Sequence, residues 1–96
     1  MRILLRPHLK IRLKERIIPQ NYPNKIVSTP DEKYFDTATN HHIAVKKLEY
    51  NGKVRPMAVA YDIIGKIIQV ITVHPTTNQE IKNKLKRERW IKNEES

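Results

Sequence analysis

Two tight turns constrain this sequence more than any other feature. The chain has only two glycines in 96 residues, and each separates two runs with β-strand character. Asn51-Gly52 lies between the runs 42–50 and 54–63, and a type I′ turn is its first choice. Gly65 lies between 54–63 and 66–74. Strands joined by turns this short must be antiparallel, so the second half of the chain predicts a three-stranded meander.

Helical patterns precede the meander. Leu9, Leu13 and Ile17 recur every four residues, which predicts a first helix with one apolar stripe. A second, shorter helix is expected at residues 22–28. Residues 33–37 form a weaker candidate for a further strand.

A last helix follows the meander. Thr77-Asn78-Gln79-Glu80 has the pattern of a capping box, and Ile81 and Leu85 would dock the helix on the sheet. The order of elements predicts one α+β domain over residues 1–96, with N-terminal helices, an antiparallel sheet of about four strands and a C-terminal helix.

The positive charge is concentrated in two segments. The net charge is +9. Segment 2–16 holds six basic residues and one acidic residue, and segment 76–92 holds six basic residues and two acidic residues. The rest of the chain holds seven of each. This clustering is typical of a protein that binds nucleic acid or another polyanion, although a solvated lysine-rich surface would look the same.

Several classes of protein do not fit the sequence. There is no cysteine, which excludes disulfides and thiol chemistry and suits a cytoplasmic protein. No apolar run is long enough to span a bilayer, so no membrane is expected as a partner. No nucleotide-binding or nucleophile motif is present, so no small-molecule cofactor is expected. The adjacent His41 and His42 would point to opposite faces of a strand, so no metal site is expected.

A row of cationic side chains runs along the first predicted helix. His8, Arg12 and Arg16 recur every four residues and lie at the border of the apolar stripe. Such arginines need partners. They could bind backbone carbonyls or the carboxylates of Asp36 or Asp62, or they could face a groove and hold phosphate.

His74 stands where the last strand of the meander ends. A histidine can accept or donate a proton near neutral pH, and Pro75 then turns the chain toward a helix N-terminus that offers amides to an anion. A purely structural histidine remains the alternative. In the helix that follows, the expected nucleic-acid contacts, together with His8, are the basic side chains Lys82, Lys86, Arg87 and Arg89. Trp90 is expected to pack against the first helix or to stack on a base or a partner.

Taken together, these motifs resemble the RelE/ParE toxin superfamily, and in particular its small BrnT-like branch. The resemblance rests on the row His8, Arg12 and Arg16, on "IIP", on a short helix ending in "TPD", on a meander closing with "VITVHP" and on the basic helix. It covers residues 7–90. The chain departs from BrnT-like proteins in having "VHP" where they usually carry arginines.

The resemblance implies a toxin encoded beside an acidic antitoxin. Many members cleave mRNA, often on the ribosome, without a metal ion. ParE-type members instead poison DNA gyrase. Applied to this chain, the resemblance implies that RNA cleavage would involve His74, Arg12, Arg16, Lys46 and Tyr61. A non-catalytic module that binds nucleic acid or gyrase, and a small regulatory protein with incidental charge, are the alternatives.

Overall fold

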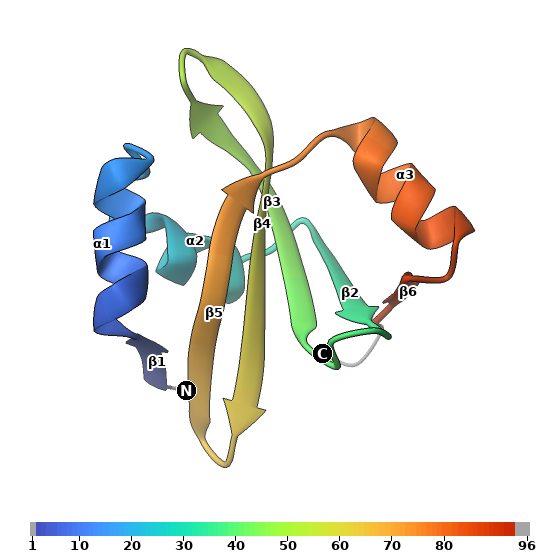
Figure 1. Cartoon of the computed structure of the whole chain (residues 1–96), viewed down its shortest axis with the longest axis horizontal. Helices are drawn as coiled ribbons and strands as arrows, with labels where there is room; N and C mark the ends of the chain where they lie inside the picture. Colours follow the sequence, from blue (N-terminus) through green and yellow to red (C-terminus); the bar gives the residue numbers. More distant parts are fainter. Residues whose placement is uncertain (1, 94–96) are drawn as a thin grey trace.

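A six-stranded mixed sheet organises the protein, whose computed structural model describes residues 2–93 (Figure 1). The strands lie in the order β1-β5-β4-β3-β2-β6. Strand β1 is parallel to β5, and the other neighbouring pairs are antiparallel. In chain order the elements are β1 (Arg2–Leu5), α1 (Pro7–Glu15), α2 (Tyr22–Ser28), β2 (Glu32–Asp36), β3 (His42–Tyr50), β4 (Lys53–Ile64), β5 (Ile67–Pro75), α3 (Asn78–Lys86) and β6 (Trp90–Lys92).

The α+β prediction is confirmed, but the sheet is larger than expected. The four predicted strands correspond to β2 to β5, and they pair as an antiparallel meander. Strands β1 and β6 were missed, and they form the two edges of the sheet. The prediction of a purely antiparallel sheet is therefore wrong at one edge, where Arg2 pairs with Ile67 in parallel.

The two glycine turns form as the sequence predicts. Asn51 and Gly52 have φ angles of 57° and 80°, the two left-handed residues that a type I′ turn requires. They join Tyr50 to its partner Lys53. Gly65 has a φ angle of 61° and begins the turn between β4 and β5. These turns fix the register that brings the end of β5 beside the start of β4.

Helices α1 and α2 cover one face of the sheet. Leu9 and Leu13 of α1 and Ile26 of α2 pack in one buried cluster with Met57 and Val59 of β4. Alternate residues of a strand point to opposite faces, so these residues define the α1/α2 face. At about 25 cal/mol per Å² of apolar surface, burial of such side chains supplies the main stabilisation of this layer.

Helix α3 covers part of the opposite face. Ala58 and Ala60 of β4 belong to a second buried cluster with Ile81 of α3 and with Tyr34 and Trp90. Figure 1 shows the arrowhead of β5 between the upper end of α1 and the start of α3. The end of β5 is thus the place where the two basic segments of the chain approach the same strand.

The first helix ends earlier than its predicted apolar stripe. Its last residue is Glu15, and Ile17 has a φ angle of 57° with 85% of its surface exposed. Ile18, which is 3% exposed, enters the core instead. Because Ile17 is in the left-handed conformation, the helix stops and the next residue points into the core in its place. The prediction that Ile17 belongs to the apolar stripe is therefore wrong.

Candidate functional site

His74 is half-buried near the end of β5, on the α3 face of the sheet. It pairs with Ala58 of β4, whose side chain lies in the cluster under α3. The chain then enters α3 through a cap, in which Thr77 Oγ1 accepts a hydrogen bond from the Glu80 backbone N–H (3.1 Å). The Glu80 carboxylate accepts a hydrogen bond from Thr76 Oγ1 (2.7 Å). The cap therefore holds a carboxylate close to His74.

The end of α1 reaches the same strand end from the other side. Arg16 is the C-cap residue of α1, and its Nη1 donates a hydrogen bond to the carbonyl oxygen of Val73 (3.1 Å). The carbonyl oxygen of Arg16 accepts a hydrogen bond from Tyr50 Oη (2.7 Å). Both the backbone and the guanidinium of Arg16 are thus fixed, which places a permanent positive charge next to His74.

The surroundings of His74 favour its neutral form. Burial lowers the pKa of His74, and the positive charges of Lys84 and Arg16 lower it further, while Glu80 opposes them. A neutral imidazole can accept a proton at neutral pH. The strand end therefore combines a proton acceptor with two cations that could stabilise developing negative charge.

The rest of the arginine row is exposed on α1. His8 and Arg12 precede Arg16 by two turns and one turn, and within residues 2–93 neither side chain forms a hydrogen bond or an ion pair. Of the suggested partners, a backbone carbonyl is found for Arg16. The carboxylates are occupied elsewhere, because Asp36 binds Arg89 and Asp62 binds His41.

Lys46 and Tyr61 lie on the other face of the sheet. Lys46 Nζ donates to the carbonyl oxygen of Thr29 (2.8 Å), beyond the end of α2. Tyr61 is 5% exposed in the α1/α2 core and stacks on His42 with ring centroids 5.4 Å apart. Burial raises the pKa of the Tyr61 hydroxyl. The predicted catalytic set is therefore not brought together, since the sheet separates these two residues from His74.

The basic residues after β5 do not gather at one place. Lys82, Lys86 and Arg87 are exposed, and Lys82 lines a shallow surface beside Tyr34 of β2. Arg89 is not part of the helix, which ends at Lys86. A separate hollow, called the α3 hollow below, has a volume of about 520 Å³ and is lined by Thr37, Glu80, Asn83, Lys84, Arg87, Glu88 and Arg89.

A buried carboxylate fixes one wall of the α3 hollow. The Asp36 carboxylate accepts hydrogen bonds from Arg89 Nε (2.8 Å) and Trp90 Nε1 (3.2 Å), and from the backbone N–H groups of Ala38 (2.9 Å) and Thr39 (3.1 Å). Burial alone would raise the pKa of Asp36, but these hydrogen bonds hold it well below its usual range.

The expected position of Trp90 is wrong. Trp90 is 3% exposed and stacks on Tyr34 with ring centroids 5.4 Å apart, on the α3 face and away from α1. Lys84 Nζ lies over the Trp90 ring, 4.8 Å from its centroid. Trp90 is therefore core and does not offer a free surface for stacking on a base.

Two residues that influence His74 were not assigned to its site from the sequence. Glu80 and Lys84 both act on its pKa. The capping box could have indicated Glu80, because the third helical residue lies close to the strand end that the cap follows. Lys84 follows Glu80 by one helical turn, so the same reasoning would have found it.

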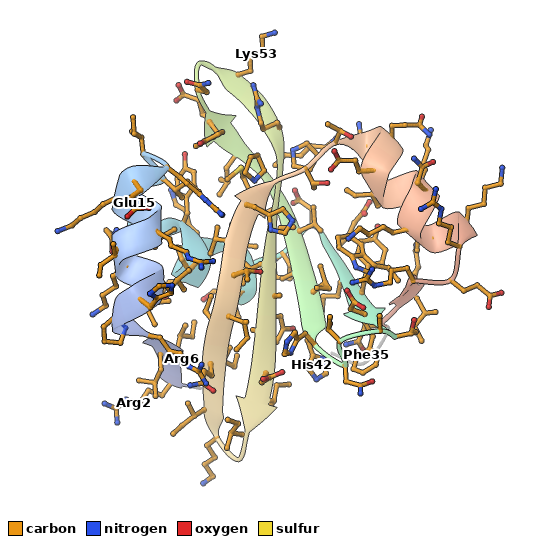
Figure 2. All side chains as sticks on the ribbon, in the orientation of Figure 1. Arg2, Arg6, Glu15, Phe35, His42 and Lys53 are labelled. Carbon is orange, nitrogen blue, oxygen red and sulfur yellow. The ribbon has the colours of Figure 1, made fainter. Side chains whose placement is uncertain are left out.

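Two arginines of the N-terminal basic segment lie at the opposite end of β5 from His74. Figure 2 shows Arg2 and Arg6 beside the lower end of this strand, opposite to its arrowhead. Arg2 pairs with Ile67, the first residue of β5. Of the N-terminal basic segment, only the C-terminal end of α1 therefore takes part in the site at His74.

Within residues 2–93, no cluster of three or more histidine, aspartate or glutamate side chains could hold a metal ion. No helix in this part of the chain has the length and apolar character to cross a membrane.

Comparisons of the chain with protein-family models, with curated proteins and with solved structures found no match.

Proposed function

We propose that this protein is the toxin of a toxin–antitoxin pair and cleaves RNA without a metal ion at the end of β5. One observation carries the proposal: His74 is half-buried at the end of β5, where Arg16 of one basic segment binds the Val73 carbonyl oxygen and where the cap leads into α3, which carries the other basic segment. A polyanion that contacts both segments would pass over this histidine.

The chemistry that this arrangement supports is transesterification within the RNA. His74 accepts the proton of a ribose 2′-hydroxyl, and the 2′-oxygen attacks the adjacent phosphorus. The bond from phosphorus to the 5′-oxygen breaks, which leaves a 2′,3′-cyclic phosphate and a 5′-hydroxyl that takes its proton from water. Arg16 and Lys84 stabilise the charge on the phosphoryl oxygens. No oxidant, reductant or cofactor is needed.

The resemblance to RelE/ParE toxins supports the same proposal. Two helices, a meander closing at "VHP" and a basic helix are the features on which that resemblance rests, and the chain folds in this order. An acidic antitoxin is the expected protein partner, because the exposed faces of α1 and α3 carry an excess of cations. The RNA would be free mRNA or mRNA on the ribosome.

A second function is favoured by one specific observation. Lys46 and Tyr61 are separated from His74 by the sheet, so the site has fewer acid–base groups than the sequence led us to expect. A protein that binds nucleic acid or gyrase without cleaving anything would need only the two basic segments.

The decisive experiment is induced expression with mapping of RNA 5′ ends, and with gyrase supercoiling measured in parallel. We expect growth arrest, new 5′ ends and 2′,3′-cyclic phosphate termini. His74→Ala should fold, bind RNA and lose cleavage by about 10²-fold or more, the size expected for a general base.

A matched histidine variant controls for this loss. His41 lies in the β2–β3 connection and binds Asp62, which pairs with Gln69 toward the other end of β5. His41→Ala should retain cleavage. Growth arrest without new RNA ends, together with loss of supercoiling, would support the non-catalytic alternative and contradict the ribonuclease.

A further inference from the structure

The α3 hollow is lined by three cationic side chains, of which Arg89 is paired with the Asp36 carboxylate. Within residues 2–93, the Arg87 side chain has no hydrogen bond or ion pair, and Lys84 Nζ lies over the Trp90 ring. Arg89 uses Nε for Asp36, so its two terminal nitrogens remain available. A guanidinium fork with free terminal nitrogens is suited to phosphate oxygens.

The hollow also contains the carboxylate of Glu88, which would repel a bare phosphate ion. Glu88 has a φ angle of 57°, and its backbone is held because its carbonyl oxygen accepts a hydrogen bond from Thr37 Oγ1 (2.9 Å). No partner for its carboxylate is found in the described part of the chain. The site therefore presents fixed donors for an anion and, close by, an acceptor that needs an N–H group.

Shape and position add to this chemistry. The volume of about 520 Å³ is in the range of pockets that hold a small organic ligand. Glu80 and Lys84 line the hollow and also act on His74. An RNA with its scissile phosphate at His74 could therefore continue along this side of α3.

We propose that the α3 hollow binds one nucleotide of the RNA, next to the nucleotide cleaved at His74. Arg87 and Arg89 hold its phosphate, and Glu88 accepts a hydrogen bond from an exocyclic amino group of its base. Cytosine fits this arrangement better than uracil, which has a carbonyl oxygen where cytosine has the amino group. This inference rests on the proposed function for the choice of RNA as the ligand.

The test compares CMP with UMP, two ligands of nearly equal size and charge, by titration calorimetry of the full chain. We expect CMP to bind about fivefold to tenfold more tightly, the order of one charge-assisted hydrogen bond. Glu88→Gln, whose amide can both donate and accept, should abolish the preference. Arg87→Ala should weaken both ligands by about fivefold or more.

A control with the same loss of charge is available outside the hollow. Lys53 lies at the tip of the β3–β4 hairpin (Figure 2), and Lys53→Ala should leave both affinities unchanged. Equal affinities of CMP and UMP for the wild type, or an Arg87→Ala protein that binds both normally, would overturn the inference.

The outcome can be separated from that of the proposed function. A protein that cleaves RNA but does not distinguish CMP from UMP contradicts the nucleotide site and leaves the ribonuclease intact. A protein that binds CMP with the expected preference, but forms no 2′,3′-cyclic phosphate from any RNA, contradicts the ribonuclease and leaves the nucleotide site intact.

Discussion

Arg16 donates a hydrogen bond to the carbonyl oxygen of Val73, 57 residues further along the chain, and so fixes the end of α1 beside His74. The bond satisfies a backbone acceptor near the end of β5 and leaves the other guanidinium nitrogens available. One side chain thus connects the first basic segment with the strand that carries the candidate catalytic histidine.

This contact predicts how neighbouring charges control His74. Arg16→Ala and Lys84→Ala should each raise the pKa of His74, because each removes a positive charge that disfavours the imidazolium. Glu80→Gln should lower it. The pKa values can be measured by NMR titration of the imidazole nitrogens. An unchanged pKa in both cation variants would show that burial alone controls the group.

The same shift predicts the pH dependence of RNA cleavage. A general base must be neutral, and the pKa of His74 lies below its ordinary value of 6.5. The rate should therefore be constant from neutral pH down to this lowered pKa and fall only at more acidic pH. In Arg16→Ala the fall should begin at higher pH. A wild-type rate that already decreases between pH 8 and pH 7 would contradict the role of His74.

Local sequence patterns predicted the meander, whereas the sheet edges depended on long-range pairing. Asn51-Gly52 and Gly65 determine their turns by backbone conformation, so β3, β4 and β5 could be placed from the sequence. Arg2 of β1 pairs with Ile67 of β5, a partner far along the chain that no local turn determines. The four residues of β1 contain no pattern that predicts this pairing.

The site could be predicted only in part for a related reason. His74 and Arg16 were predicted as site residues from a strand end and a helical row, and the structure brings Arg16 to the residue before His74. The face to which a strand residue points depends on register and bulges. The register shift between β4 and β5 leaves one extra residue in β5, Ile71, and so determines the face of His74. Tyr61 keeps the regular alternation of β4, on the face of Met57 and Val59, and the sequence does not say which face of β4 the helices α1 and α2 cover.

Asp36 should be the carboxylate on which folding depends most. Asp36→Asn keeps the shape but removes the charge that four donors share in a 6% exposed side chain. We expect a loss of about 2–4 kcal/mol in the free energy of unfolding, measured by urea denaturation at pH 7. Loss of less than about 0.5 kcal/mol would contradict this role.

The lowered pKa of Asp36 adds a pH signature. Its contribution is complete above the ordinary value of 3.8 and is lost as the pH falls toward the lower pKa of the folded state. Wild-type stability should therefore approach that of Asp36→Asn in acid. Parallel stability curves for the two proteins from pH 7 to pH 2 would contradict the assignment.

Tyr61→Phe and Lys46→Ala test whether the sheet really divides the predicted catalytic set. Tyr61 is buried against His42, and Lys46 binds the carbonyl oxygen of Thr29 on the α1/α2 face. Each variant should retain cleavage within about threefold, well below the 10²-fold effect of a general acid or base. A 10²-fold loss in a folded Tyr61→Phe protein would restore the tyrosine to the reaction.

Salt dependence tests whether both basic segments contact the same RNA. Each phosphate contact on a single strand contributes about 0.7 to the slope of log affinity against log salt. The Arg12→Ala and Arg87→Ala variants should each reduce the slope by the amount that one phosphate contact contributes. The double variant should reduce it by about twice that amount. The slope is measured with a single-stranded RNA and the His74→Ala protein, so that cleavage does not interfere. If Arg12→Ala leaves the slope unchanged while Arg87→Ala lowers it, RNA follows α3 alone, and the cationic row of α1 serves another partner.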